Sequence, residues 1–242
     1  MKSRINKIMR ILAIDTSTKV CSVALFNKGE IRSVVRSSSK KPAEIVLSMI
    51  QNLLSESEIY LNQLNALAYN RGPGSFTGLR IGISIAQGIG LGLDLPLIGI
   101  SSLAVLAENA WHLTRIKRVL VALNAYMGQI YWAEYQRINL SNSCWKGVET
   151  ETILNPLEVK SKISNLNGIW CVAGNGWYTY QYLKDLKKVY VSTPVSIPIA
   201  NNILPLAIVE YKEGKIFSAD CSSVEPYYIR NDLLWKKLPG RT

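Results

Sequence analysis

Two turns in the sequence carry residue types that bind phosphate. Asp15, Thr16, Ser17 and Thr18 end an apolar segment and could offer hydroxyl and backbone N–H groups to an anion. The same residues are typical of a turn that only closes a hairpin, and the turn lacks the glycine that lets a phosphate approach the backbone. A second turn follows a later apolar segment, at residues 174–176. The candidate cofactor-binding residues are therefore Asp15, Thr16, Ser17, Gly174 and Gly176.

The glycine-rich segment GPGSFTG, at residues 72–78, matches no catalytic motif. Leu79 stands where a phosphate-binding loop has its lysine, and the glycine spacing is not that of a dinucleotide-binding turn. Ser75 lacks the spacing of a hydrolase nucleophile, and the single histidine, His112, falls in a predicted helix. The sequence has no HxxxH or HExxH pattern and no cysteine pair for a metal. We therefore expect neither catalytic residues nor a metal site.

The segment after this turn predicts an apolar helix that is unusually rich in glycine, with Thr77 as its expected cap. Each interior glycine costs about 1 kcal/mol of helix stability relative to alanine, so close packing must offset that cost. One stripe of the helix is small and the adjacent stripe is bulky: Gly82, Ala86 and Gly90 against Ile81, Ile85, Ile89 and Leu93. We expect the bulky stripe to face the lobe's own sheet and the small stripe to face another helix. That helix belongs either to a partner chain or to residues 42–55 of the same lobe.

The elements around these motifs occur in a repeated order. The first part of the chain predicts an apolar strand, a polar turn and two further strands, followed by a helix that opens at Pro42. A buried strand, the glycine helix, another strand and a helix capped by Ser101 or Ser102 come next. The pattern restarts at Arg118, with Asn124 where Asp15 stood. A repeat of about 110 residues is too long for a solenoid. It predicts an α/β protein with duplicated βββαβα lobes facing each other, the actin-like (ASKHA) architecture.

The predicted lobes cover residues 9–105 and 106–242, and residues 1–8 form an extension. The C-terminal helix, which contains Pro205, and the tail after it either stay in the second lobe or return to the first. Because Met9 directly precedes the first strand, both Met1 and Met9 are kept as possible starts.

Composition predicts a folded protein that remains in solution. The chain has 242 residues, of which 48% are hydrophobic and 19% charged. Its cysteines form no pair, and polar residues and Pro96 interrupt its longest apolar tract, at residues 81–100, so we expect a reduced, cytoplasmic protein without a membrane span. The net charge of +11 permits binding to nucleic acid but equally fits evenly scattered lysines. Clustering of five basic residues on one face would favour direct RNA binding: Arg10, Arg32, Arg36, Lys40 and Lys41.

Four segments closely resemble the TsaB (YeaZ) family: RILAIDTSTKVCSVAL, NRGPGSFTGLRIGISIAQGIGLG, MGQIYWAEYQR and PYYIRNDLLWKKLPG. The match runs from Met9 to Gly240. The resemblance implies an actin-like fold and a role in making threonylcarbamoyladenosine beside the anticodon of tRNAs that read codons beginning with A. It assigns the transfer from threonylcarbamoyl-AMP to the metal-binding paralogue TsaD. TsaB resembles a degenerate, non-catalytic copy that pairs with TsaD, and the ATPase TsaE joins them.

The resemblance implies a helix bundle with TsaD built from residues 42–55 and 77–93. The implied interface residues are Val46, Met49, Ile50, Leu53, Gly74, Ser75, Phe76, Thr77, Arg80, Gly82, Ala86 and Gly90. No cofactor is expected to bind this chain tightly, with ATP or ADP at the complex interface as an open point. We expect tRNA to be contacted through the complex, and a homodimer through the same helices is the alternative in isolation.

Two other functions stay open at this point. A small-molecule kinase of the same superfamily would require an intact phosphate turn in both lobes, and Asn124 cannot act as a base. A direct tRNA-binding module would require a clustered basic face. The chain also departs from many relatives at Pro42 and Ala43, where they have His followed by Ser or Thr, and at Asn124, which is often Asp.

Overall fold

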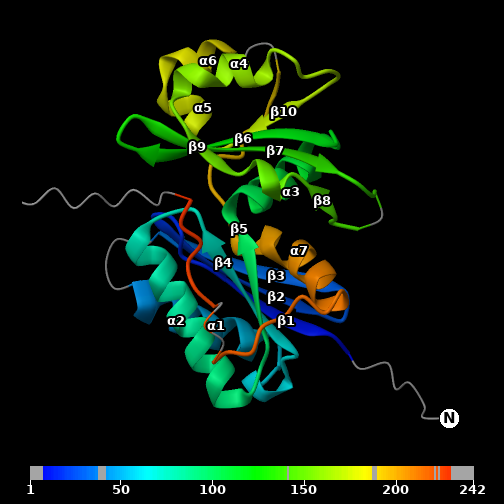
Figure 1. Ribbon diagram of the computed structural model, residues 1–242. Helices are drawn as coiled ribbons and strands as arrows, with labels where there is room; N and C mark the ends of the chain where they lie inside the picture. The colour runs from blue at the N-terminus through cyan, green and yellow to red at the C-terminus, as the bar shows by residue number, and fades with distance from the viewer. Residues whose placement is uncertain are drawn as a thin grey trace, which may run out of the picture.

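The computed structural model describes residues 8–37, 42–140, 142–186, 190–220, 222 and 224–229. Each of its two lobes is built on one β-sheet, and the lobes face each other across a pair of helices (Figure 1). The predicted α/β arrangement with two lobes is confirmed.

The first lobe contains a mixed sheet with the strand order β3-β2-β1-β4-β5. Its strands are β1 (Arg10–Asp15), β2 (Val20–Asn27), β3 (Glu30–Ser37), β4 (Ala66–Gly72) and β5 (Leu97–Ser101). The pairs β1–β2 and β2–β3 are antiparallel, whereas β1–β4 and β4–β5 are parallel. Strands β1 and β4 are apolar on both faces because helices cover both sides of the sheet. The edge strand β3 is largely exposed and carries arginines.

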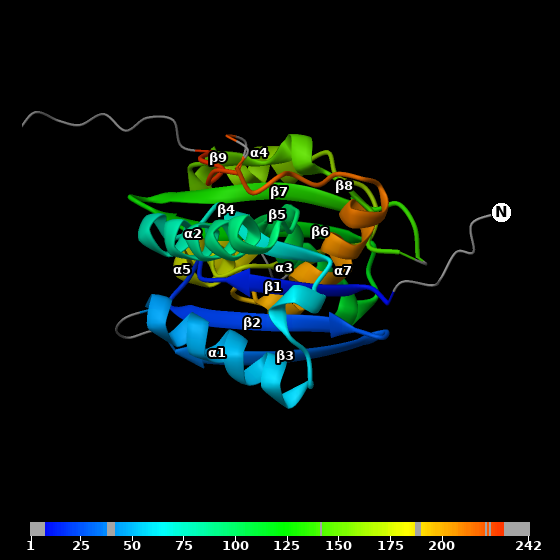
Figure 2. The same cartoon turned by 90° about the horizontal axis from the view of Figure 1, so that it is seen from below.

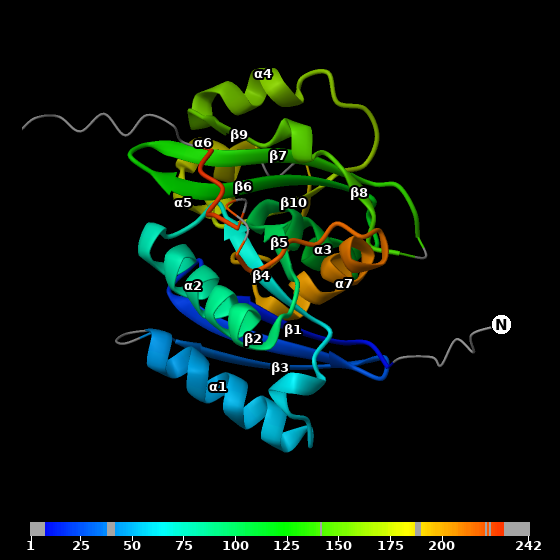
Figure 3. The same ribbon diagram turned by 60° about the horizontal axis from the view of Figure 1, so that its bottom comes forward.

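Helices α1 (Pro42–Glu56) and α2 (Phe76–Leu93) contact each other on the outer side of this sheet (Figures 2 and 3). Pro42 opens α1 as predicted, because a proline at the first helical position needs no N–H partner. The cap of α2 is Ser75, whose hydroxyl accepts from the Gly78 N–H at 3.3 Å, so the prediction of Thr77 as cap was wrong. The helix ends at Asp94, which adopts a left-handed backbone with φ 51°. A short 3₁₀ turn, η1 (Leu61–Gln63), leads from α1 into β4.

The second lobe repeats the plan around a sheet with the order β11-β10-β6-β7-β8, in which β9 also pairs with β7. The strands are β6 (Arg118–Tyr126), β7 (Gln129–Arg137), β8 (Trp145–Lys146), β9 (Thr152–Leu154), β10 (Cys171–Ala173) and β11 (Val191–Ser192). Helices α4 (Val159–Ile163), α5 (Gly176–Thr179) and α6 (Gln181–Leu186) lie on its outer side (Figure 1), and two 3₁₀ turns, η2 (Val148–Thr150) and η3 (Pro156–Glu158), lie in the chain between β8 and α4. As in the first lobe, an antiparallel hairpin, here β6–β7, is followed by a parallel strand on the other side.

Two helices exchanged between the halves join the lobes. Helix α3 (Ser102–Thr114), capped by Ser101 as expected, packs Leu103 and Leu106 into the core beneath the second sheet. Helix α7 (Ala200–Lys212) packs Ile203 and Leu204 against the first sheet. The predicted lobe boundary between residues 105 and 106 falls inside α3, so a single cut would divide this helix.

The C-terminal segment follows α7 back to the first lobe. Leu97 and Phe217 exchange backbone hydrogen bonds of 2.8 and 2.9 Å, and Ala219 and Val224 enter the core of that lobe. Helix α7 and the described residues from Phe217 to Val224 thus pack on the first lobe.

Candidate functional site

The Asp15 turn is buried and bonded within the chain. Oδ1 of Asp15 accepts from the Ser17 N–H at 2.8 Å and from its hydroxyl at 2.7 Å, and Oδ2 accepts from Asn70 Nδ2 at 2.8 Å. Burial raises the pKa of Asp15 above its ordinary value, while the hydrogen bonds from Asn70 and Ser17 act in the opposite direction. The carboxylate therefore ties β1 to β4, and its acceptor positions are used inside the protein.

Asn70 extends this network toward α3. Its Oδ1 accepts from the Gly72 N–H at 2.8 Å and from the Ser102 hydroxyl at 2.6 Å. The backbone N–H of Ser75 closes the arrangement by donating to the Ser17 carbonyl at 2.7 Å. The Asp15 turn thus holds together the ends of two strands and the starts of α2 and α3.

A cleft of ≈ 560 Å³ lies between the two lobes. Polar and apolar side chains from both lobes line the cleft, and they include the ammonium group of Lys19. The lining residues are Ser17, Thr18, Lys19, Val20, Gly74, Ser75, Leu123, Asn124, Tyr126, Tyr131, Asn175 and Ile197. Of the five candidate cofactor-binding residues, Ser17 is among these lining residues.

The other turn packs against β6. A Cβ atom at Gly176 would lie 2.8 Å from the Ala122 carbonyl oxygen, and one at Gly174 would overlap the same atom. Gly174 also adopts φ +101°, which a residue with a side chain rarely does. These glycines therefore let the turn approach a strand, and Asn175, which the sequence analysis did not select, is the residue that lines the cleft.

The small stripe of α2 faces the protein's own interior. Gly82 packs against Thr16, whose hydroxyl donates to the Gly78 carbonyl at 2.7 Å, and a Cβ at Gly90 would lie 2.9 Å from the Ala219 Cβ. Ala86 is fully buried between them. The prediction that this stripe faces another helix was wrong, because the Asp15 turn and the returning C-terminal segment occupy that side.

The bulky stripe of α2 is partly buried: Ile85 and Ile89 pack against the core of the first lobe and, with Ile81, also line an apolar groove. One part of the groove, of ≈ 670 Å³, is lined by Ala43, Leu47, Phe76, Thr77, Arg80, Ile81, Ser84, Ile85, Gly88 and Ile89. A second part, of ≈ 770 Å³, is lined by Leu47, Ile50, Gln51, Leu54, Ser55, Glu58, Ile59, Tyr60, Leu61 and Ile89. The parts share Leu47 and Ile89, so they form one continuous surface between α1 and α2, which we call the α1/α2 groove.

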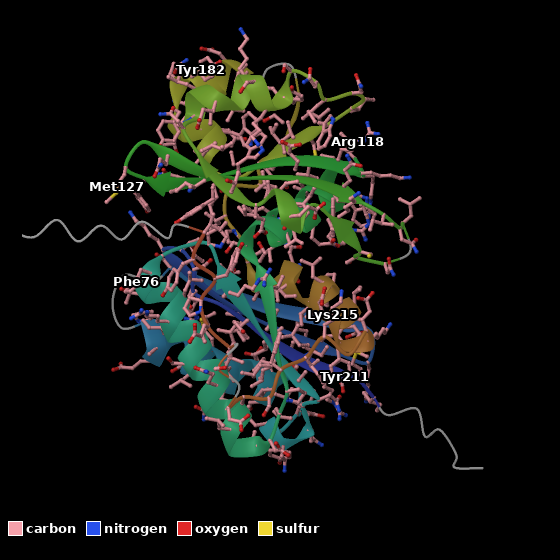
Figure 4. The ribbon with its side chains drawn as sticks, in the orientation of Figure 1. Phe76, Arg118, Met127, Tyr182, Tyr211 and Lys215 are labelled. Atoms are coloured by element: carbon pink, nitrogen blue, oxygen red, sulfur yellow. The ribbon has the colours of Figure 1, made fainter. Side chains whose placement is uncertain are left out.

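The C-terminal segment frames this surface at the start of α2. Phe76 stacks on Tyr228 with ring centroids 5.8 Å apart, and the Arg80 guanidinium lies 4.0 Å from the Phe76 ring centroid. Arg80 Nε also donates to the Tyr228 hydroxyl at 3.1 Å. Phe76 remains 48% exposed at the edge of the molecule (Figure 4). An aromatic and cationic cluster therefore marks one end of the α1/α2 groove.

Comparison with known proteins identifies the family. The family model "TsaD: tRNA N6-adenosine threonylcarbamoyltransferase" matches residues 34–163. The Escherichia coli protein named tRNA threonylcarbamoyladenosine biosynthesis protein TsaB is 45% identical over 234 residues, which cover 96% of this chain and 100% of that protein. The chain belongs to the TsaB family. The Haemophilus influenzae TsaB is 37% identical and covers 96% of this chain and 98% of its own length.

Solved structures support the same assignment. A Pseudomonas aeruginosa crystal structure, described as an uncharacterized protein similar to the peptidase YeaZ, matches with a TM-score of 0.79 and 31% identity over 92% of this chain and 100% of that one. A second structure, described as YeaZ from the same organism, has a TM-score of 0.78, 31% identity, and covers 91% and 99% of the two chains. The two-lobed actin-like fold implied by the TsaB resemblance is confirmed.

The structure corrects the interface residues predicted on α1. In this TsaB-family chain the residues Val46, Met49, Ile50 and Leu53 are buried in the first lobe's own core, and of these four Ile50 also lines the α1/α2 groove. The helix must cover β2 with its apolar stripe, so the residues that periodicity selects are those that the sheet uses. Leu47 lies off that stripe and is 51% exposed. An apolar residue outside the core-facing stripe was the signal that the sequence analysis missed.

The interface residues predicted on α2 divide into three sets. Gly82, Ala86 and Gly90 are buried and face inward. Gly74 and Ser75 line the cleft between the lobes, whereas Phe76, Thr77 and Arg80 line the α1/α2 groove. Four further residues line the α1/α2 groove and were not among the predicted interface residues: Tyr60, Ile85, Gly88 and Ile89.

Among the described residues, no group of three or more His, Cys, Asp or Glu side chains could hold a metal ion. His112 Nε2 lies 3.0 Å from the buried Glu108 carboxylate, which also binds Arg137 at 2.7 Å and Trp145 Nε1 at 2.6 Å. The single histidine therefore contacts a buried ion pair that joins α3 to β7 and β8.

The positive charge is concentrated outside the described residues. Those residues contain 17 of the 28 Lys and Arg and 16 of the 17 Asp and Glu, a formal net charge of +1. Of the cluster proposed for RNA, Arg10 donates to Asn27 and Arg32 donates to the Glu56 carbonyl, while Lys40 and Lys41 lie outside the described residues.

One helix in the described part, α2, is long and apolar enough to cross a membrane by length and composition alone.

Proposed function

We propose that this chain is a non-catalytic subunit in tRNA threonylcarbamoyladenosine biosynthesis that binds TsaD through the α1/α2 groove. The observation that carries the proposal is the apolar groove itself, at which Leu47 and Phe76 are about half exposed. Apolar side chains that remain at a surface in one continuous groove are typical of a protein interface. TsaE and tRNA then join through the complex, in the cytoplasm, with ATP or ADP at the complex interface.

The groove suits a partner helix. Ser84, Gly88 and Gly92 lie four residues apart on α2, and a Cβ atom at Gly88 or Gly92 would meet nothing within 4 Å. Small residues between bulky ones let two helices approach closely, and the distance between helix axes depends on the side chains at the contact. The close approach that the sequence analysis assigned to Gly82 is therefore assigned to Gly88.

The transfer reaction itself is assigned to TsaD, because the matching family model names TsaD as the tRNA N6-adenosine threonylcarbamoyltransferase. The Asp15 carboxylate of this chain accepts hydrogen bonds from Ser17 and Asn70 and has a structural role in this proposal. A homodimer through the same groove is the alternative in isolation, because the exposed apolar surface is available to a second copy.

Gly88 permits a test that separates binding from folding. Gly88→Leu has room in the isolated chain, so it should fold, but the new side chain fills the α1/α2 groove. Gly88→Ala is the matched control because it makes the same backbone change and adds only a methyl group. We would co-express each variant with TsaD and measure the complex by multi-angle light scattering and its threonylcarbamoyl transfer to tRNA.

We expect Gly88→Ala to form the complex and Gly88→Leu to lose the complex and the transfer activity while its thermal midpoint is unchanged or higher. A Gly88→Leu variant that still forms an active complex would refute docking in the groove. An inactive variant that still binds TsaD would mean that the groove serves the reaction in another way.

A further inference from the structure

The hairpin between β6 and β7 exposes two bulky residues in an unfavourable backbone conformation. Tyr126 is 68% and Met127 is 87% exposed, and their φ angles are 58° and 50°. Gly128 follows with φ 75°, so three consecutive residues are left-handed, of which one is a glycine. Residues with side chains adopt this conformation rarely, and such residues cluster where their placement serves a function.

The surrounding structure holds this conformation in place. The pairing of β6 with β7 shifts between Asn124 and Tyr126, which is an irregularity that redirects side chains at the end of a hairpin. Oδ1 of Asn124 accepts from the Tyr126 N–H at 3.0 Å and from the Tyr180 hydroxyl at 3.2 Å. The Asn124 N–H in turn donates to Asn175 Oδ1 at 2.8 Å. The tip is therefore built into the second lobe by Asn124 of β6 and by the two residues that flank α5, Asn175 and Tyr180.

The tip is continuous with the surface assigned to the partner. Tyr126 lines the cleft between the lobes together with Ser75, and the next residue, Phe76, lines the α1/α2 groove. Figure 4 shows Met127 and Phe76 on the same side of the molecule. The surface thus runs from α1 and α2 across the mouth of the cleft to the tip of the hairpin.

The residue types at the tip are those of a protein interface. Tyrosine and methionine are enriched at such interfaces, and a tyrosine held rigidly is a frequent source of binding energy.

We infer that the β6–β7 tip is a second anchor for the same protein partner that takes the α1/α2 groove, with Tyr126 and Met127 entering an apolar depression on that partner. This inference rests on the proposed function for the identity of the partner. Asn124 is then a positioning residue, since its side chain holds the tip without being needed at the contact. The duplicated lobe contributes its hairpin to assembly, where the first lobe contributes its helices.

The test compares two pairs of exposed residues at opposite ends of β7. The tip variant is Tyr126→Ser with Met127→Ser, and the control is Ile138→Ser with Leu140→Ser, whose side chains are 66% and 58% exposed beyond the far end of the strand. The dissociation constant of each full chain for TsaD is measured by titration calorimetry, beside Gly88→Leu. We expect the tip variant to bind about tenfold or more weakly, as loss of a hot spot does, and the control to bind within about twofold of the parent.

The arms separate the two proposals. If the tip variant keeps the parent affinity while Gly88→Leu loses binding, the inference is overturned and the proposed function stands. If all variants bind TsaD like the parent, both fall. A tip variant that loses affinity for unmodified tRNA alone, with TsaD affinity intact, would assign the tip to RNA and also overturn the inference.

Asn124 supplies a further readout. Asn124→Ala removes the acceptor that fixes the Tyr126 N–H, whereas Asn124→Asp keeps it. We expect the alanine variant to weaken TsaD binding and the aspartate variant to restore it, with equal thermal midpoints in both. Equal affinities for the alanine variant and the parent would remove Asn124 from the positioning role.

Discussion

The two faces of α2 predict opposite effects of one substitution, glycine to alanine. At Gly88 a Cβ atom meets nothing within 4 Å, so Gly88→Ala changes only the intrinsic helix preference. Alanine is favoured over glycine inside a helix by about 0.5–1 kcal/mol. The variant should therefore increase the free energy of unfolding by about that amount.

Gly82→Ala receives the same gain in helix preference but places its Cβ against the Thr16 hydroxyl, closer than real side chains approach. Thr16 must move, and the hydrogen bond from its hydroxyl to the Gly78 carbonyl is lost at a buried position. An unsatisfied buried polar group costs about 1–3 kcal/mol, and overpacking costs about 1–3 kcal/mol. Because the gain in helix preference is common to both variants, we expect Gly82→Ala to be less stable than Gly88→Ala by about 2–6 kcal/mol.

Urea unfolding of the isolated chain, followed by circular dichroism, measures this difference from the shift in midpoint at a constant denaturant dependence. A Gly82→Ala variant as stable as Gly88→Ala would show that the Asp15 turn does not press on α2, and the orientation of the helix would have to be reversed. The result also bears on the double variant Gly82→Leu with Ala86→Leu, which is unsuited to test partner binding because both positions are buried. Its loss of binding would follow from loss of the folded lobe.

The remaining predictions concern the contribution of two buried carboxyl groups, Glu108 and Asp15, to the free energy of unfolding. Glu108→Gln leaves the Arg137 side chain, which is 2% exposed, without its charged partner, so unfolding should become easier by about 3–5 kcal/mol in the same urea assay. Burial alone raises the pKa of Glu108, but hydrogen bonds from His112 and Trp145 and the charge of Arg137 bring this pKa below its ordinary value of 4.5. The stability that the ionised Glu108 contributes is therefore complete above pH 4.5 and is lost as the pH falls through the lower pKa of the folded state. Glu108→Gln should abolish this loss. Burial raises the pKa of Asp15, so the folded state binds its proton more tightly and stability should fall as the pH rises from 3.8 through the raised pKa. Asp15→Asn should remove that fall, and a variant with the parent's slope between those pH values would exclude Asp15 as its source.

Local signals in the sequence were sufficient for the elements of the first lobe and their order, whereas the short strands β8, β9 and β11 of the second lobe were not predicted. Proline at the start of α1, a serine before α3 and the apolar runs of β1 and β4 each depend on neighbours a few residues away. The repeat of these signals after Arg118 was sufficient for two lobes. Such signals are read correctly because their physical causes act within one helical turn or one strand.

The orientation of α2 depends on contacts that no local pattern contains. Ala219 and Val224 reach the helix from more than a hundred residues further along the chain, and the Val224 carbonyl accepts from Gln87 Nε2 at 3.3 Å. A periodic pattern shows that a helix has a small side and a bulky side, but not which side the rest of the chain covers. The same limit applies to α1, whose core-facing stripe looks the same whether it covers a sheet or a partner.

The two hairpin turns of the lobes use a polar side chain in the same way. Asp15 and Asn124 lie near the end of the first strand of each lobe, and each side chain accepts a hydrogen bond from a backbone N–H two residues further on. Asp15 fixes the end of β4 from which α2 begins, through Asn70. Asn124 fixes the tip that carries Tyr126 and Met127. The hydrogen bonds that close each turn also position the surface beside it. A substitution at either residue should therefore weaken binding of the partner by displacing that surface, whether or not the cleft between the lobes holds a ligand.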